Sequence, residues 1–196
     1  MARMKVPIAD LRPTQLTLGM SEVAARAARI AKLPTDDREA YIDGKAIPHV
    51  IGPGKKLFMV DHHHLVRALW SLGIGEAALG DRLADWSDLE VKVFWRKMES
   101  SGYCWPIDAD GNRRPYADIP SHVSDLTDNF WRSLARRVRG KAFENLDTPF
   151  QEFMWGDYFR TFMSRRLIEA HFELAVDLAT KLARVTDAQD LPGFRG

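Results

Sequence analysis

Residues 47–72 constrain the fold of this chain more than any other stretch. Two short runs rich in β-branched or large apolar residues, at 48–51 and 57–60, are separated by Gly52-Pro53-Gly54. Such runs on either side of a glycine- and proline-rich turn predict a β-hairpin. The apolar spacing then changes to the three- and four-residue pattern of a helix, up to Leu72. The stretch therefore predicts two paired strands followed directly by a helix.

The predicted helix begins with an unusual group of side chains. Asp61 is a favourable N-cap residue, so His62, His63 and His64 are expected in the first helical turn. The N–H groups of a first turn have no partner within the helix, and the helix dipole also favours anions there. Imidazoles can donate hydrogen bonds or exchange a proton. We therefore expect a phosphate site at residues 61–64, with Asp61, His63 and His64 as acid–base candidates.

Two other uses of the histidines stay open. Successive helix residues project about 100° apart, so three consecutive imidazoles cannot all contact one metal ion. Two of them could still share a metal with His49, Asp36 or Asp37. Any one of them could instead cap, stack or face solvent. We prefer the phosphate site, because a turn at this position does not need such residues to fold, and we assign no metal ligands.

Composition excludes little. Lys and Arg number 28 and Asp and Glu number 27, so the net charge of +1 gives no general reason to bind nucleic acid or a membrane. Cys104 is the only cysteine, which excludes an intramolecular disulfide and fits a reducing compartment. No stretch approaches the roughly 18 apolar residues of a membrane span, and residues 1–13 lack the apolar core of a signal peptide. We expect a cytoplasmic protein with no membrane partner.

The rest of the chain predicts an α+β fold. The elements expected from apolar spacing and breaker residues are strands at 4–8 and 89–95, a β-hairpin with an Asp-Gly turn at 104–116, and helices at 21–33, 36–44, 129–139, 149–163 and 164–185. We therefore predict a mixed sheet with helices over residues 1–120, followed by a helical extension packed on it over residues 121–196.

Several other polar residues are candidates for ligand contacts. Arg12 and Gln15 lie in a polar loop after the first strand, where loop capping is an equal alternative. Arg132, Arg136 and Arg139 recur at helical spacing and form one basic face that could contact nucleic acid. Because the net charge is near zero, a solvated face is the simpler explanation of these arginines.

Residues 61–69, DHHHLVRAL, follow a strand and resemble the signature turn of the ParB/sulfiredoxin superfamily. They are most similar to its branch of ParB-like putative nucleases, and residues 6–15, 103–106, 116–120 and 150–155 also resemble that branch. The resemblance implies a small ParB/sulfiredoxin-like mixed sheet. It also implies that the turn holds the phosphates of a nucleotide such as CTP or ATP, with a divalent metal as a companion.

Carried onto this chain, the phosphate-binding box of the family falls on His62, His63 and His64. The catalytic cysteine of sulfiredoxins would fall at His63, so the resemblance does not extend to reduction of cysteine sulfinate. The usual arginine of the family falls at Leu65, and Arg67 is the expected substitute.

The resemblance also bears on residues outside the turn. Lys55 or Lys56 could take the place of the family arginine instead of Arg67. Asp36, Asp37 and Glu39 stand where related kinases place a catalytic carboxylate before the sheet, and Asp37 is our candidate among them. The alternative is that these acids simply complement the dipole of a helix that they begin.

Together these features predict a ParB-like protein that binds a nucleotide or nucleic acid through phosphate at residues 61–64. Its expected chemistry is that of a hydrolase, namely a nuclease, or of a phosphotransferase, with a histidine as general acid or base. The alternative is a non-catalytic nucleotide-sensing or DNA-associated module, which the arginine helix and the displaced family arginine favour. A second copy of the chain is a further partner compatible with the sequence.

Overall fold

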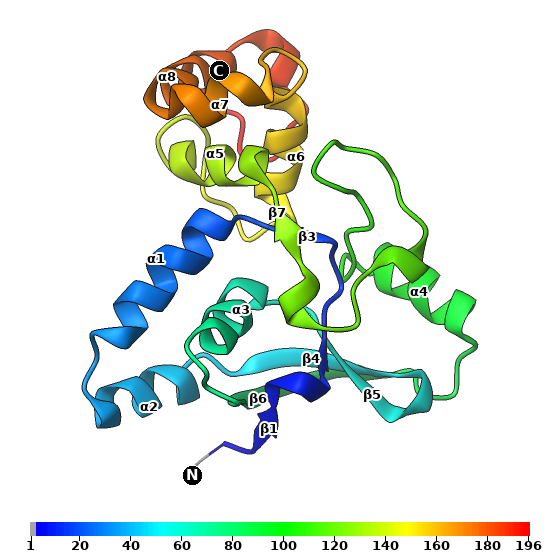
Figure 1. The fold of residues 1–196 in the computed structure, drawn as a ribbon. Coiled ribbons are helices and arrows are strands. Elements are labelled where there is room, and N and C mark those ends of the chain that lie inside the picture. Colours follow the sequence, from blue (N-terminus) through cyan, green and yellow to red (C-terminus); the bar gives the residue numbers. More distant parts are fainter. Residues whose placement is uncertain (1–2) are drawn as a thin grey trace. The chain divides into compact units, whose positions relative to one another are not determined.

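The structure is a computed structural model that describes residues 3–196, and the chain divides into two compact units, residues 1–127 and 128–196. Figure 1 shows their elements. In the first unit these are β1 (Lys5–Pro7), β2 (Leu11–Arg12), β3 (Thr17–Leu18), α1 (Met20–Ala31), α2 (Thr35–Asp43), β4 (Ile47–Gly52), β5 (Lys56–Met59), α3 (His63–Ser71), β6 (Glu76–Asp85) and α4 (Val91–Ser100). The short strand β7 (Thr127–Asp128) lies at the boundary.

The first unit is built on a mixed sheet in the strand order β1-β6-β4-β5-β2. The strand β6 pairs antiparallel with β1 on one side and parallel with β4 on the other. The strand β5 pairs antiparallel with β4 and parallel with β2. Helices α1 and α3 pack together with apolar sheet residues in one core, which includes Ile8, Ile30, Ile47 and Leu65. The predicted α+β fold is confirmed.

The predicted hairpin and following helix are also confirmed. Val50 of β4 pairs with Phe58 of β5, and the connecting turn contains Gly54 with a left-handed φ of 70°. Three residues, Val60 to His62, separate the end of β5 from the start of α3. Its buried face includes Leu65 and Leu69, which have the four-residue spacing seen in the sequence.

The strand predicted at 89–95 is wrong, because this segment forms the helix α4. Its alternating Val91, Val93 and Trp95 favoured a strand. In the structure, Phe94 and Met98 are buried one helical turn apart, while Val91 and Val93 are exposed. Phe94 and Met98 are four residues apart and lie on the same face of a helix. Burial of these two side chains outweighs the local strand preference of the valines.

Two other sheet predictions need correction. The ten-residue strand β6 lies in a segment for which no strand was expected, because its alanines and charged residues are weak strand formers. At 104–116 the predicted turn forms, with the Asp108 carboxylate accepting the N–H groups of Asp110 and Asn112. The flanking strands do not form: Ile107 and Arg113 make one isolated bridge between the two flanks, and Trp105 makes another with Gln15 instead.

The second unit is helical, as predicted. Its helices are α5 (Phe130–Val138), α6 (Gln151–Phe159), α7 (Arg165–Ala170) and α8 (Phe172–Leu182). The single helix predicted at 164–185 is broken at His171, whose backbone is not helical. The core contains the stacked rings of Phe143 and Trp155, with centroids 4.2 Å apart. None of the helices within residues 3–196 is both long and apolar enough to cross a lipid bilayer.

Candidate functional site

The turn between β5 and α3 contains a residue in a rare backbone conformation. His62 has φ 66° and ψ 18°, which is the left-handed region that residues other than glycine seldom adopt. The Asp61 carboxylate accepts the His62 N–H at 2.5 Å and lies 3.8 Å from the His62 Nδ1. His62, not Asp61, is therefore the residue at the N-cap position, which corrects our expectation for Asp61. The bond from Asp61 instead helps to hold His62 in its strained conformation.

His63 is used inside the fold. Its side chain is 3% exposed, and its Nε2 accepts the backbone N–H of Thr14 at 3.1 Å. The Thr14 hydroxyl lies 3.3 Å from the same nitrogen and donates to the Met59 carbonyl at 2.9 Å. Burial lowers the pKa of His63 to about 4. The imidazole is therefore neutral at physiological pH, and its geometry connects α3 to the loop after β2.

His64 makes a similar connection to a different segment. Its Nε2 accepts the N–H of Gly19, the residue that precedes α1, at 3.2 Å. A nitrogen that accepts this hydrogen bond cannot carry a proton. Two of the three imidazoles therefore hold backbone donors of the N-terminal segment, which is a structural role that the sequence left open.

His62 and His64 are both partly exposed, and 28% of the His62 side chain reaches solvent. Unlike His63 and His64, His62 does not accept a backbone N–H from the described part of the N-terminal segment through its ring. Burial is the largest influence on its pKa and lowers it, and the positive charges of Arg26 and Lys45 act in the same direction. The Asp61 carboxylate opposes them, but the net pKa is lowered. The turn thus combines a neutral imidazole, two nearby cations and the positive end of a helix.

Arg26 and Lys45 were not among the residues that we predicted for the site. Arg26 lies on α1 beside its buried stripe, and α1 packs against α3. Lys45 precedes β4, and the Val60 N–H donates to the Pro48 carbonyl, so the start of this hairpin strand lies beside the end of its partner. The antiparallel pairing of the predicted hairpin could have placed Lys45 near the turn. No local sequence pattern indicates that Arg26 lies near it.

The other residues that we predicted as ligand contacts or catalytic groups have different partners or positions in the structure. The Arg67 guanidinium donates to the Ser71 hydroxyl at 2.7 Å, one turn further from the start of α3. Gln15 is buried and donates to the Thr17 carbonyl within its own loop, and Arg12 is half-buried in β2. Asp37 is exposed in the first turn of α2 and is not among the charges that act on His62.

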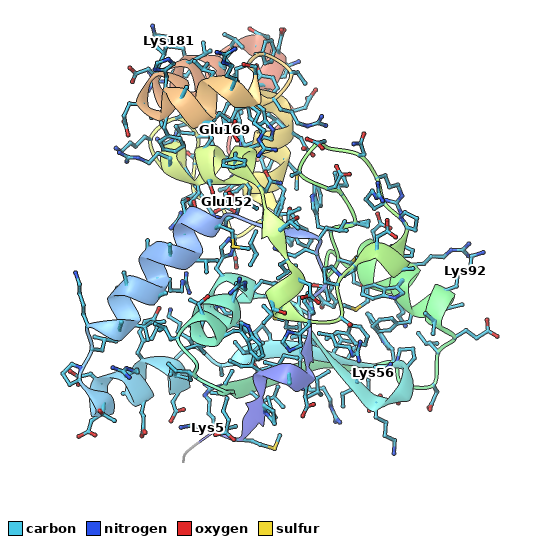
Figure 2. The ribbon with its side chains drawn as sticks, in the orientation of Figure 1. Lys5, Lys56, Lys92, Glu152, Glu169 and Lys181 are labelled. Atoms are coloured by element: carbon cyan, nitrogen blue, oxygen red, sulfur yellow. The ribbon has the colours of Figure 1, made fainter. Side chains whose placement is uncertain are left out.

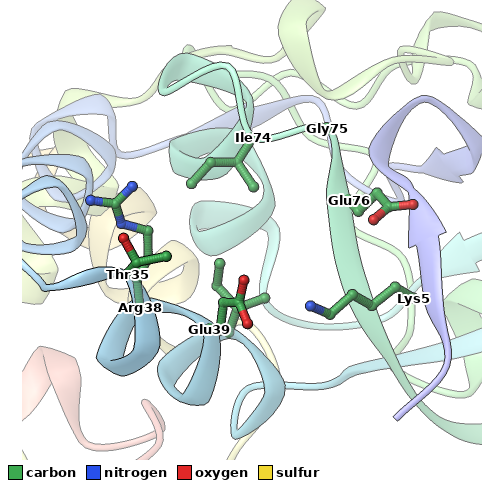
Figure 3. A pocket seen from close by; sticks show the side chains of 8 residues that line it. Lys5, Thr35, Arg38, Glu39, Ile74, Gly75 and Glu76 are labelled. Atoms are coloured by element: carbon green, nitrogen blue, oxygen red, sulfur yellow. The ribbon is translucent and has the colours of Figure 1, made fainter. Parts of the chain in front are cut away.

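A hollow of about 280 Å³ lies beside α2, β1 and β6. Figure 3 shows the side chains that line it. Its lining includes Thr35, Arg38 and Glu39 of α2 but not Asp37. Lys5 extends across the hollow toward Glu39 of α2, and Glu76 lies on the strand side of the hollow, opposite Glu39. Because the lining has two cations and two carboxylates, it favours neither sign of ligand. Across the described residues 3–196, no three His, Cys, Asp or Glu side chains are grouped to hold a metal ion.

The arginines that we predicted to form one basic face have two different environments in the second unit. Arg139 donates to the Glu152 carboxylate at 2.5 Å, and Arg132 lies 3.6 Å from the same oxygen, with all three side chains largely buried. Glu152 is labelled in Figure 2. Arg136 and Arg137 are exposed. Two of the three arginines that we considered for nucleic acid thus form a buried ion pair network with Glu152.

The strand, the turn and α3 form the segment that resembled the ParB/sulfiredoxin superfamily, and a family comparison decides the assignment. Residues 4–161 match the family model described as "Putative ParB-like nuclease". The chain belongs to this ParB-like family. The crystal structure of protein Atu1540 from Agrobacterium tumefaciens is similar to this ParB-like chain, with 33% identity and a TM-score of 0.89 over 98% of this chain and 96% of that chain. A comparison of this ParB-like chain with curated proteins finds no match.

Proposed function

We propose that this ParB-like protein binds a phosphate-bearing ligand at residues 61–63, with Arg26 and Lys45 as the cations that contact it. The observation that carries the proposal is the position of His62, partly exposed at the start of α3 and under the influence of both cations. Backbone N–H groups at a helix start and positive side chains attract the same ligands, namely phosphates. In this proposal Arg26 and Lys45 take the place that the sequence gave to Arg67.

We assign the acid–base role to His62 instead of His63 or His64. In hydrolysis of a phosphodiester, the neutral His62 would remove a proton from water while the water oxygen bonds to phosphorus. The ester P–O bond would then break, and the proton would pass from the imidazolium to the departing oxygen. Asp61 would stabilise the imidazolium. The family description supports nucleic acid as the substrate class.

A specific observation favours a second candidate function, that of a binding module without turnover. The imidazoles of His63 and His64 accept backbone N–H groups, which leaves one histidine for chemistry. Saturable binding of nucleotide or oligonucleotide without product would support this second function.

The test separates binding from chemistry. Arg26→Gln and Lys45→Gln should each weaken binding of ATP and of a single-stranded oligonucleotide about tenfold, measured by calorimetry, because each removes one charge-assisted contact. His62→Asn should retain binding within a few-fold but lose cleavage of a labelled oligonucleotide, assayed with and without Mg²⁺. Lys92→Gln, which changes an exposed lysine on α4, is the matched control. Unchanged affinity in both Arg26 and Lys45 variants would overturn the site.

Binding should also depend on pH. Without ligand the pKa of His62 is lowered, whereas a bound phosphate stabilises the imidazolium and raises that pKa. Ligand binding should therefore take up protons and tighten as pH falls from 8 to 6. Calorimetry in two buffers of different ionisation enthalpy measures this uptake, which His62→Asn should abolish.

A further inference from the structure

A second hollow lies on the sheet itself, away from the turn before α3. Its volume is about 400 Å³, within the range typical of small-molecule sites. Its lining comes from β1, β6, β4 and β5 and from Met4 just before β1, and these strands are adjacent in the sheet. The apolar members of the lining are Met4, Val6, Ile51, Leu57 and Leu79.

None of the residues that line this hollow belongs to a helix. Alternate residues of a strand point to the same face, and Ile51 and Leu57 are directly paired neighbours on β4 and β5. The hollow is therefore a patch of one sheet face that side chains of the strands enclose. An apolar lining of this kind would gain stability from a covering apolar group.

His49 gives the hollow a buried polar group. The residue is 4% exposed, and its Nδ1 is buried with no hydrogen-bond partner within residues 3–196. Buried polar atoms in proteins nearly always have a partner, so such an exception needs an explanation. Burial lowers the pKa of His49 most, a backbone hydrogen bond with Ile47 raises it, and the charge of Arg82 lowers it again, so the net pKa is lowered and the ring is a neutral hydrogen-bonding group.

Arg82 gives the hollow a positive charge beside that imidazole. It pairs with His49 across β6 and β4, and among residues 3–196 its guanidinium is the only formal charge in the lining. Its side chain is mostly exposed, and its contact with the Asp85 carboxylate is long, at 3.9 Å. The Asp85 carboxylate is held more closely by the Ser87 hydroxyl, at 2.7 Å. Arg82 is therefore free to turn toward a ligand.

We propose that this hollow binds a small amphiphilic monocarboxylate. Its apolar body would lie on Val6, Ile51, Leu57 and Leu79, and its carboxylate would meet Arg82 beside His49. A planar guanidinium matches a carboxylate with two parallel hydrogen bonds. One cation in the lining fits one negative charge, whereas a dianionic phosphate would need a second. This site is separate from residues 61–63 and does not depend on the function proposed for them.

The test compares two probes that differ only in charge, octanoate and octanamide, with wild-type protein at pH 7.5. Calorimetry should show that octanoate binds with a stoichiometry of one and at least about tenfold more tightly than octanamide, as expected for a charge-assisted contact. Arg82→Gln should reduce the affinity for octanoate to that for octanamide. Arg96→Gln, which changes an exposed arginine on α4 outside the hollow, should bind octanoate as the wild type does.

Equal affinity for the two probes, or an Arg82→Gln variant that binds octanoate normally, would overturn the proposal. Leu79→Asp should abolish binding of both probes. If the wild type is instead a dimer that Leu79→Asp converts to a monomer and octanoate does not bind, the hollow is a contact between copies and the carboxylate site is wrong. Should Leu79→Asp fail to fold, Arg82→Gln and the octanamide comparison still decide the question, because both leave the apolar lining intact.

Discussion

The buried His63 predicts a specific loss of stability in acid. Its pKa is about 4 in the folded protein and 6.5 in an ordinary environment, so the unfolded chain binds a proton that the folded chain does not. Stability contributed by neutral His63 is therefore complete above pH 6.5 and is lost as the pH falls toward 4. The lowered pKa corresponds to about 3 kcal/mol in the free energy of unfolding.

The variant His63→Gln isolates this contribution. A glutamine oxygen can accept the Thr14 N–H that the imidazole accepts, but it does not titrate. Other groups with lowered pKa values, such as His49 and His62, remain in both proteins. Between pH 7.5 and 4.5 the wild type should therefore lose about 2–3 kcal/mol more unfolding free energy than His63→Gln.

Urea unfolding at pH 7.5, 5.5 and 4.5 measures the difference. Because the chain has two units, protection of the α3 amides from hydrogen exchange is the appropriate probe, since it reports on the first unit. Parallel stability curves for the two proteins would refute the reasoning, because they would mean that His63 binds its proton equally well folded and unfolded.

Three further outcomes follow from packing and charge. Gly52→Ala should lower the free energy of unfolding in urea by about 1–3 kcal/mol, because a Cβ at this position would lie 2.5 Å from the Phe58 ring. Gly75→Ala should be near neutral, because a Cβ there would meet nothing within 4 Å. Equal effects of the two substitutions would contradict this packing. Glu152→Gln should destabilise the second unit by about 3 kcal/mol in thermal unfolding, because it leaves buried arginines without their carboxylate, and an unchanged melting temperature would argue against the network. Burial raises the pKa of Cys104 to about 12, so a thiol reagent at pH 8 should label it slowly in native protein and quickly in urea, and rapid native labelling would show the thiol to be accessible.

The parts of the fold that could be predicted are those with local signals. The Gly-Pro-Gly turn and the change of apolar period placed β4, β5 and α3 correctly. The strand β6 could not be recognised, because its place between β1 and β4 gives it partners on both edges that its own residues do not indicate. The helix α4 was mistaken for a strand because its exposed valines alternate, whereas the buried Phe94 and Met98 determine its conformation.

For the candidate site, the sequence predicted the place better than the roles. The turn at 61–64 stands out because of its three histidines, but only the folded structure distinguishes His62 from the two that accept backbone N–H groups. Those acceptor roles depend on Thr14 and Gly19, which are distant in the chain. The left-handed backbone of His62 was also unpredictable, since the local pattern favoured Asp61 as the cap.

The strand order has a consequence for the way the chain is made. The strands β1 and β2 are complete by Arg12, yet Lys5 pairs with Ala78 and Leu11 pairs with Leu57. During synthesis from the N-terminus, β2 must wait for β5, and β1 must wait for β6. The sheet is therefore completed from the β4–β5 hairpin outward, and a ribosome that pauses before Glu76 presents a nascent chain whose first strand has no partner and is open to a chaperone.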